Sequence, residues 1–303
     1  MKAAFVTGAT SYMGGLLVRR LLGDGILVHV AVRPTSDLSR LPSDLGKDCV
    51  HVLDGGAPGF SEILGEAQTD TVYHIAGAYA RDHGPADIDR LIEANITLGT
   101  HLLDGMVSAG VKNMVCVGSA FQHFHSDGYR PFNLYAATKQ AFVDIAEFYS
   151  DIEAVAVMSI TPPDVYGPGD WRPKLMNHLA DACVTDRSID LVNKSLGMAL
   201  IFADDAVDAL VTAGWALASG DDEYADGSFS IDAEGHYTLE QIVRAFENVS
   251  GRKIRANWDA YKLPPRQITK PWKGPALPNW RARVSLDAGI ERLLDHLREA
   301  GKS

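Results

Sequence analysis

The stretch Phe5-Val6-Thr7-Gly8-Ala9-Thr10-Ser11-Tyr12-Met13-Gly14-Gly15 decides the fold of this chain. The apolar run before Gly8 predicts a buried strand, and the spacing of apolar residues after it is typical of a helix. Gly8 permits a tight turn, Gly14 allows close packing, and the helix directs free N–H groups toward a diphosphate. The stretch therefore predicts a dinucleotide site. Its expected cofactor contacts are Gly8, Thr10, Ser11, Tyr12, Met13 and Gly14.

The spacing of this motif differs from the usual one, because Ser11 stands where a middle glycine is common. Ser11 adds a side chain where backbone usually approaches phosphate, but its hydroxyl can donate to a phosphate oxygen instead. Glycines also mark ordinary turns. Here the turn follows a strand and opens a helix, which favours dinucleotide binding over a plain turn.

The composition is typical of a globular protein, with 46% hydrophobic and 22% charged residues among 303. A net charge of -11 argues against a nucleic-acid partner, although a few local cations can still hold an anionic small molecule. Cys49, Cys116 and Cys183 lack metal-ligand spacing, so we expect free thiols and no metal. We see no apolar stretch that would span a membrane and no signal peptide, and we expect a cytoplasmic protein without a membrane partner.

Strand-like and helix-like segments alternate through the first half of the chain. Strands are expected at 3–7, 26–32, 49–53, 71–75, 113–118 and 154–160, with long helices at 88–109 and 132–150. This alternation predicts an α/β fold, a Rossmann doubly wound parallel sheet with helices on both faces. In such a sheet, ligands bind beyond the C-terminal ends of the strands.

The second half has fewer strand signals and predicts a smaller C-terminal α/β substrate-binding lobe. We place the NAD(P)-binding domain at 1–160, with a strand and a helix contributed from about 195–218, and the lobe mainly at 161–303. A rigid loop is expected at 161–169 and a loop or lid at 256–281. Thr238 and Gln241 predict a capping box. Helices are expected at 174–184, 204–218, 239–250 and 285–300, and a strand at 198–202.

Residues after the second, third and fourth strands predict the rest of the cofactor site. An acidic residue after the second strand favours NAD, whereas an arginine fits a 2′-phosphate; Arg33, with Ser36, therefore favours NADPH, with NAD as the alternative. Asp54 is placed to meet the adenine amino group. The small residues Ala76, Gly77 and Ala78 allow the dinucleotide to lie against the backbone, whereas His74 and Asn95 are interpreted as structural.

Three residues after the fifth strand predict proton-transfer chemistry. Tyr135 and Lys139 are four apart, so on a helix they share one face. A free tyrosine has a pKa of about 10, and a nearby ammonium lowers it. Ser119, at the expected strand end, is placed to hydrogen-bond the same substrate oxygen as Tyr135.

These residues resemble the extended short-chain dehydrogenase/reductase family (NAD-dependent epimerase/dehydratase), which contains nucleotide-sugar epimerases, dehydratases and ketoreductases. A closer likeness, over 121–124, 133–142 and 164–175, is to sugar 4-ketoreductases of the CDP-abequose synthase type. Asp164 departs from the asparagine that many epimerases use near the substrate diphosphate. The segments that carry the family resemblance are 7–14, 70–76, 95–100, Ser119, Tyr135 to Lys139, 166–169 and 202–205.

The resemblance implies a role for each of these groups. Lys139 holds the nicotinamide ribose and lowers the pKa of Tyr135. Tyr135 donates a proton to the carbonyl oxygen as hydride arrives at the carbon, and Ser119 donates a hydrogen bond to that oxygen. Further cofactor contacts are implied at Pro162 and Val165. Dehydratases carry an Asp-Glu pair after the active Ser or Thr, where this chain has Ala120 and Phe121, so dehydration is not expected.

We therefore expect NADPH-dependent reduction of the 4-keto group of a CDP- or dTDP-linked 4-keto-6-deoxyhexose. A 4-epimerase with tightly bound NAD is the alternative, and a non-catalytic NAD(P)-sensing regulator is a third hypothesis. A homodimer is expected through 88–109 and 132–150. The tentative substrate contacts are Tyr79, Gln122, His123, Asp164, Arg172 and Lys174.

Overall fold

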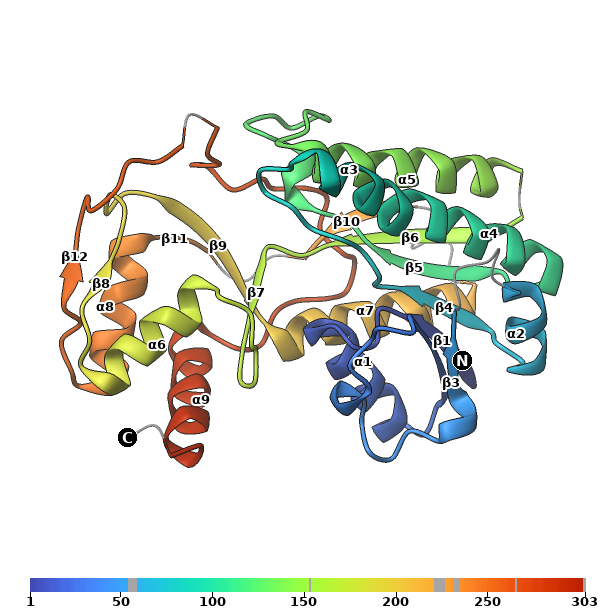
Figure 1. Ribbon diagram of the computed structural model, residues 1–303, viewed down its shortest axis with the longest axis horizontal. Helices are drawn as coiled ribbons and strands as arrows, with labels where there is room; N and C mark the ends of the chain where they lie inside the picture. Colours follow the sequence, from blue (N-terminus) through green and yellow to red (C-terminus); the bar gives the residue numbers. More distant parts are fainter. Residues whose placement is uncertain (54–58, 153, 221–226, 232–234, 265, 302–303) are drawn as a thin grey trace.

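A parallel sheet of seven strands forms the larger part of this computed structural model (Figure 1), which describes residues 1–53, 59–152, 154–220, 227–231, 235–264 and 266–301. The strand order is β10-β6-β5-β4-β1-β2-β3, and each neighbouring pair is parallel. This order confirms the predicted doubly wound sheet. The strands are β1 Ala3–Thr7, β2 Leu27–Val32, β3 Val50–Val52, β4 Thr71–His74, β5 Asn113–Val117, β6 Ala156–Thr161 and β10 Gly227–Ser230.

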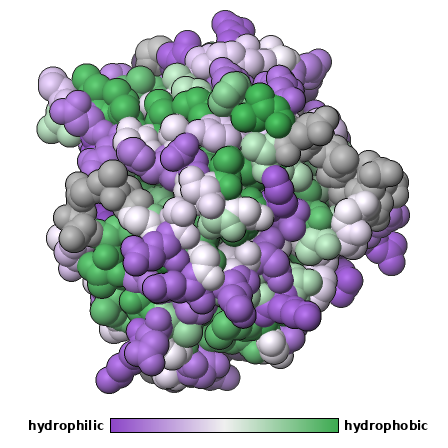
Figure 2. Space-filling model, turned by 90° about the vertical axis from the view of Figure 1, so that its right-hand side faces the viewer, coloured by the Kyte–Doolittle hydropathy of each residue, from purple (hydrophilic) through white to green (hydrophobic). Residues whose placement is uncertain are grey.

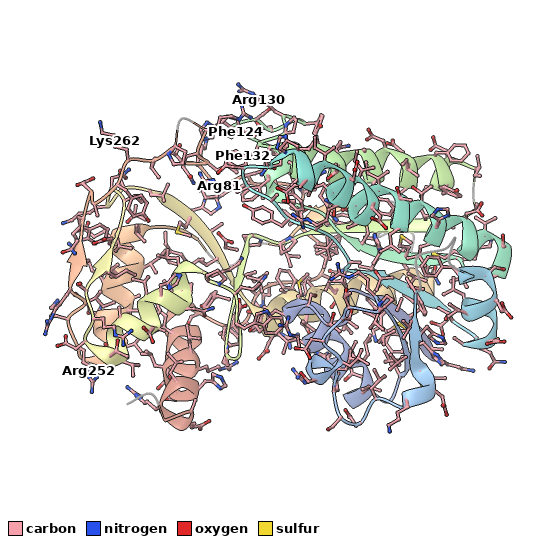
Figure 3. The ribbon with its side chains drawn as sticks, viewed as in Figure 1. Arg81, Phe124, Arg130, Phe132, Arg252 and Lys262 are labelled. Carbon is pink, nitrogen blue, oxygen red and sulfur yellow. The ribbon has the colours of Figure 1, made fainter. Side chains whose placement is uncertain are left out.

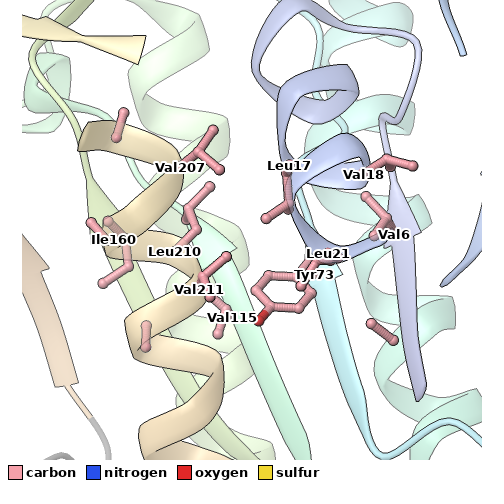
Figure 4. Packing of buried hydrophobic residues seen from close by; sticks show 14 of the residues in the cluster. Val6, Leu17, Val18, Leu21, Tyr73, Val115, Ile160, Val207, Leu210 and Val211 are labelled. Atoms are coloured by element: carbon pink, nitrogen blue, oxygen red, sulfur yellow. The ribbon is translucent and has the colours of Figure 1, made fainter. Parts of the chain in front are cut away.

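Successive strand residues point to opposite sides of this sheet. Apolar side chains lie on both sides, and helices cover both faces. Val6 packs on the face covered by α1 (Tyr12–Gly23) and α7 (Ala203–Ser219), as Figure 4 shows. Phe5, its neighbour in β1, packs on the opposite face. That face is covered by α2 Phe60–Glu66, α4 Leu98–Ala109 and α5 Leu134–Asp151. With both faces covered, all five residues of β1 are buried.

The smaller lobe has its own core and lies beside the sheet lobe (Figure 1). The strands β7 Asp164–Tyr166, β9 Gly197–Phe202 and β11 His236–Thr238 form one sheet, and β8 Ile189–Asp190 pairs with β12 Ala256–Asn257. The helices are α6 Leu175–Thr185, α8 Leu239–Ser250 and α9 Leu286–Glu299. Thr238 and Gln241 form the predicted capping box of α8. No helix among the described residues has the length and apolarity needed to cross a membrane.

Some elements differ from the sequence-based expectation. The loop expected at 161–169 contains the strand β7, and β9 belongs to the small sheet rather than to the nucleotide-binding half. The main sheet takes its seventh strand from β10 instead. Its sequence, Gly-Ser-Phe-Ser, has a weak strand signal, and pairing with β6 places it. The domain boundaries themselves stay a prediction.

The helix expected over 88–109 is divided. α3 (Pro85–Ile92) leads into a π-helical turn at Glu93–Thr97, and α4 follows. Asn95 lies in this turn, where its amide accepts from the Ala78 N–H at 2.8 Å and donates to Thr138 Oγ1 at 2.9 Å. The irregular turn therefore ties the helix to the loop after β4 and to α5, which agrees with the structural role expected for Asn95.

Candidate active site

The turn between β1 and α1 has the shape of a phosphate cradle. Gly8 has a φ of +73°, and a Cβ on it would lie 2.6 Å from the Ala76 nitrogen. A Cβ on Gly14 would lie 2.2 Å from the Gly8 carbonyl oxygen. Ser11 caps α1 by accepting a hydrogen bond from the Gly14 N–H at 3.1 Å, which leaves its hydroxyl hydrogen free to donate. The departure at Ser11 is therefore compatible with an anion at this helix end.

The loop after β4 lies against this cradle and is fixed by hydrogen bonds. The Ala76 N–H donates to Thr7 Oγ1 at 3.3 Å. A Cβ on Gly77 would lie 3.1 Å from Asn95 Oδ1. The absence of a side chain at Gly77 therefore allows this loop to pack against Asn95. His74 is buried within hydrogen-bond distance of Thr7, and burial and the Lys139 charge lower its pKa to about 3, so it is a neutral structural histidine as expected.

Tyr12 and Arg172 join the cradle to the smaller lobe. The Tyr12 hydroxyl donates to the Pro168 carbonyl at 3.1 Å, and the Arg172 guanidinium lies 5.0 Å from the centre of the Tyr12 ring. Arg172 also donates twice to Asp170, at 2.7 Å each, and the Asp170 side chain is 0% exposed. A buried carboxylate needs a partner of opposite charge, and Arg172 is that partner for Asp170. The contact of Arg172 with a substrate diphosphate stays a prediction.

The other cofactor residues are placed as follows. Arg33 is exposed at the end of β2 without a side-chain partner among the described residues, and its backbone N–H donates to Ser36 Oγ at 3.0 Å. Val165 is buried in β7, whereas Pro162 and Thr10 are half-buried. Asp54 lies outside the described residues. The structure thus brings Arg33 and Ser36 together where a 2′-phosphate was expected.

Ser119 and Tyr135 meet at the carboxyl edge of the sheet. Ser119 follows β5 and caps the short helix Ala120–Gln122, and Tyr135 lies in the first turn of α5, which Asn133 caps. Burial raises the pKa of Tyr135, a hydrogen bond from Ser119 lowers it, and Tyr79 raises it. Lys139 is not among these causes, so the predicted lowering of the Tyr135 pKa by Lys139 is wrong for this structure. At neutral pH the phenol is protonated.

Lys139 lies one turn beyond Tyr135 and is 5% exposed. Burial lowers the pKa of its ammonium. The ammonium has no hydrogen bond or ion pair with any residue that the structure describes. An unpartnered buried charge is unfavourable, so this position suits a ligand that brings hydroxyl groups to Lys139. Among the described residues, no group of His, Cys, Asp or Glu is arranged to hold a metal.

Gln122 holds Ser119 in place. Its side-chain oxygen accepts from the Ser119 N–H at 2.8 Å, and its nitrogen donates to Gln140 at 2.8 Å. Gln122 is only 5% exposed. Both ends of its amide are engaged, so the tentative assignment of Gln122 to the sugar is corrected, and Gln122 positions Ser119 instead.

Asp164 and Lys174, expected at the substrate, pair with each other at 2.8 Å. They lie near Tyr79, because Asp164 is one of the charges that raise the Tyr79 pKa, after the larger effect of burial. Tyr79 is 51% exposed, and its ring centre lies 5.0 Å from that of Tyr135. Tyr79 is thus the tentative substrate residue that the structure places beside the proposed proton donor.

A segment within the loop or lid expected at 256–281 packs against residues near this region. We call residues 266–272 the strap. Arg266 donates to the carbonyls of Pro131 and Phe132, at 2.8 and 2.9 Å, and Arg81 donates to Gln267 at 2.8 Å. Arg81, Phe124 and Phe132 gather where the chain passes between the lobes (Figure 3).

His123 meets the strap rather than open space. Its ring stacks on Trp272 with centres 3.8 Å apart and an angle of 3°. Nearby, the Thr269 N–H donates to His125 Nε2 at 3.1 Å. Thr269 and His125 are 144 positions apart in the sequence. Sequence patterns carry no signal for such a pairing. Whether His123 faces the sugar stays a prediction.

The fold and the Ser–Tyr–Lys group define an NAD(P)-dependent oxidoreductase or epimerase of the extended short-chain dehydrogenase/reductase class. The sequence pattern of the NAD dependent epimerase/dehydratase family matches residues 4–225. The chain belongs to this family, which confirms the resemblance described above. An NAD(P) cofactor is typical of the family.

The curated relatives of this chain include proteins named for nucleotide sugars and a sterol demethylase protein B from Methylococcus capsulatus, which is 26% identical over 185 residues and covers 56% of this chain. The chain is 22% identical over 308 residues to a CDP-abequose synthase from Salmonella muenchen, with 97% of each chain covered. It is 24% identical over 314 residues to a UDP-glucose 4-epimerase from Mycolicibacterium smegmatis, with 97% of each covered.

Solved structures share the fold over the whole chain. A UDP-glucuronic acid 4-epimerase from Bacillus cereus in complex with NAD has a TM-score of 0.78 at 18% identity, with 98% of this chain and 99% of that chain covered. A Thermus thermophilus UDP-glucose 4-epimerase in complex with NAD has a TM-score of 0.78 at 20% identity, with the same coverage of 98% and 99%. These similarities support the fold class.

Proposed function

We propose that this chain uses NADPH to reduce the 4-keto group of a CDP- or dTDP-linked 4-keto-6-deoxyhexose. One observation carries the proposal: Ser119 hydrogen-bonds a protonated Tyr135, and one turn further along α5 the buried Lys139 has no partner among the described residues. The similarity to CDP-abequose synthases from three bacteria, at 22% to 26% identity, supports the choice of substrate class.

The residues present fit the cofactor. Gly8 and Gly14 allow the close backbone packing that forms the turn at the start of α1, where free N–H groups can meet a phosphate. The Arg33 guanidinium has no partner among the described residues and is available for a 2′-phosphate. Lys139 would donate hydrogen bonds to the hydroxyls of the nicotinamide ribose. When bound, NADPH supplies the hydride for the reduction. The pocket residues supply orientation and the proton.

Ser119 and Tyr135 would then bind the ketone oxygen between their hydroxyls. The Tyr135 hydroxyl donates its proton to that oxygen, and Ser119 stabilises the negative charge that develops on it. Burial favours the protonated phenol, which is the form required of a proton donor. Gln122 keeps the Ser119 backbone in position for this contact.

A 4-epimerase is the second candidate, and the NAD complexes of structurally similar UDP-sugar 4-epimerases support it. An epimerase retains its cofactor and consumes none. The test is an assay of NADPH and NADH consumption with CDP- and dTDP-4-keto-6-deoxyglucose. A reductase consumes one reduced cofactor per sugar. Copurified NAD and no consumption would favour the epimerase.

Arg33→Glu should reverse the cofactor preference. The substitution removes the cation proposed for the 2′-phosphate and offers a carboxylate to the ribose 2′-OH. We expect kcat/KM for NADPH to fall by about 10–100-fold, as for loss of one charged contact, while the value for NADH is maintained or rises. Initial rates with both cofactors measure this. An unchanged NADPH/NADH ratio would rule out Arg33 as the selecting residue.

The two reaction directions should differ in their dependence on pH. Reduction needs protonated Tyr135, whose pKa is raised by burial, so its rate should stay level between about pH 7 and about pH 9. Oxidation of the product needs the phenolate, so its rate should rise about tenfold per pH unit over the same range. Rates measured in both directions at fixed saturation test this. A decline in reduction across that range would show a lowered pKa.

The cytoplasmic location, the homodimer and the limits of the two domains remain predictions. Exposed apolar side chains on α3, α4 and α5, among them Ile92, Val107 and Phe148, support the expected dimer helices. The face in Figure 2, at the end of the molecule that carries α2, includes hydrophobic residues gathered near its upper edge. Light scattering in solution would measure the oligomeric state.

A further inference from the structure

Aromatic rings surround one side of the Tyr135 phenol. Tyr79 meets the Tyr135 ring edge-on, at 5.0 Å and 82°, and Phe121 does so at 6.5 Å and 85°. The rings of Tyr79 and Phe121 are also 6.1 Å apart, so both lie on the same side of Tyr135. Phe132 supports Phe121 from behind at 5.2 Å and is 8% exposed. We call Tyr79 and Phe121 the aromatic wall.

The aromatic wall lies where a sugar must bind. Tyr79 follows β4 and Phe121 follows β5, and both strands end at the carboxyl edge of the sheet, where Ser119 and Tyr135 meet. Besides burial, the groups that shift the Tyr135 pKa are the Ser119 hydroxyl and Tyr79. Charged groups act on Tyr79 instead: after burial, which raises its pKa, Arg81 lowers the pKa and Asp164 and Asp82 raise it. Phe121 therefore gives this flank an apolar surface beside the phenol, whereas the ring of Tyr79 also carries a hydroxyl.

The chemistry of a pyranose 4-ketone determines what such a flank accepts. The ketone carbon has two ring neighbours: C3, which carries a hydroxyl in most sugars, and C5, which carries the C6 group. A hydroxyl pressed against the Phe121 ring would lose its water without gaining a hydrogen bond, whereas a methyl group gains from burial there. The wall therefore suits the C5 side of a sugar whose C6 is a methyl.

We infer that Phe121 selects 6-deoxy sugars over sugars with a hydroxymethyl or a carboxylate at C5. This inference rests on the proposed function. An apolar pocket rejects an added hydroxyl by only about 10–100-fold, because the hydroxyl still fits. A carboxylate is rejected more strongly, since its charge would be buried without a partner.

The test compares matched sugars in the direction of oxidation with NADP⁺. CDP-6-deoxyglucose is paired with CDP-glucose, and CDP-fucose with CDP-galactose, so that both configurations at C4 are covered. The measured quantity is the ratio of kcat/KM within each pair. Calorimetric titration of the same sugars gives the ratio of Kd as a second readout that does not depend on turnover. We expect the wild type to favour the 6-deoxy member by about 10–100-fold.

Two variants at one position separate polarity from size. Phe121→Gln brings an amide to the wall and should reduce the ratio to below about threefold. Phe121→Leu keeps the wall apolar and should retain most of the preference, and Phe132→Leu controls for packing behind it. Equal kcat/KM for both members in the wild type, or a full preference in Phe121→Gln, would overturn the inference and leave the proposed function standing. No oxidation of any of the four sugars would overturn both.

Discussion

Tyr135→Phe is expected to lower kcat for ketone reduction by about 100–10,000-fold, which is the usual contribution of a positioned proton donor. The substitution removes one oxygen, the proton source, and leaves the ring in place. The ring contacts with Tyr79 and Phe121 are therefore retained. The measurement is the rate of NADPH consumption with a CDP-4-keto-6-deoxyhexose, together with the Kd for NADPH.

A second tyrosine on the same helix provides the control. Tyr149 lies near the C-terminal end of α5, and its ring packs on Phe148, away from Ser119. Tyr149→Phe should keep the parent rate. Both variants should bind NADPH and unfold at nearly the parent temperature. A Tyr135→Phe enzyme with the activity of the Tyr149→Phe enzyme would remove Tyr135 from the mechanism.

Gly14→Ala is expected to abolish tight cofactor binding and to destabilise the fold. The added Cβ would lie 2.2 Å from the Gly8 carbonyl oxygen, which is backbone and cannot rotate away. Overpacking of this kind costs about 1–3 kcal/mol in the free energy of unfolding. The displaced turn should also raise the Kd for NADPH by about tenfold or more, equivalent to about 1.4 kcal/mol. Denaturant titration and fluorescence titration of NADPH measure the two effects.

The same helix offers a matched glycine. A Cβ on Gly23, the last residue of α1, would meet no atom within 4 Å. Gly23→Ala should therefore be neutral or raise the free energy of unfolding by about 0.5–1 kcal/mol, with an unchanged Kd for NADPH. Equal effects of the two substitutions would show that helix propensity, and not the turn beside Gly8, determines the result.

The sequence predicted the sheet well because its signals are local. The apolar runs in the first half correspond to β1 to β6 within one or two residues, and the Gly8–Gly14 spacing marked the turn that the structure contains. Capping residues predicted where a helix begins, as Thr238 does for α8. By contrast, β10 has one large apolar residue, Phe229, and its place depends on pairing with β6.

The site was predicted less completely, because side-chain partners depend on tertiary contacts. Ser119, Tyr135 and Lys139 were found by spacing. Spacing did not reveal the hydrogen bonds of Gln122 with Ser119 and Gln140, and for that reason the sequence analysis assigned Gln122 to the sugar. The direction of the Tyr135 pKa was also wrong, because spacing along a helix does not reveal that burial outweighs charge.

The most direct test of the central claim follows one hydrogen atom. The enzyme is incubated with a CDP-4-keto-6-deoxyhexose and NADPH that carries deuterium at the transferred position of its nicotinamide ring, and the sugar is analysed by mass spectrometry. A ketone reductase must deliver this deuterium to C4. The account predicts one deuterium at C4 of every product molecule. A product without deuterium, or recovery of the ketone with the label still in NADPH, would contradict it.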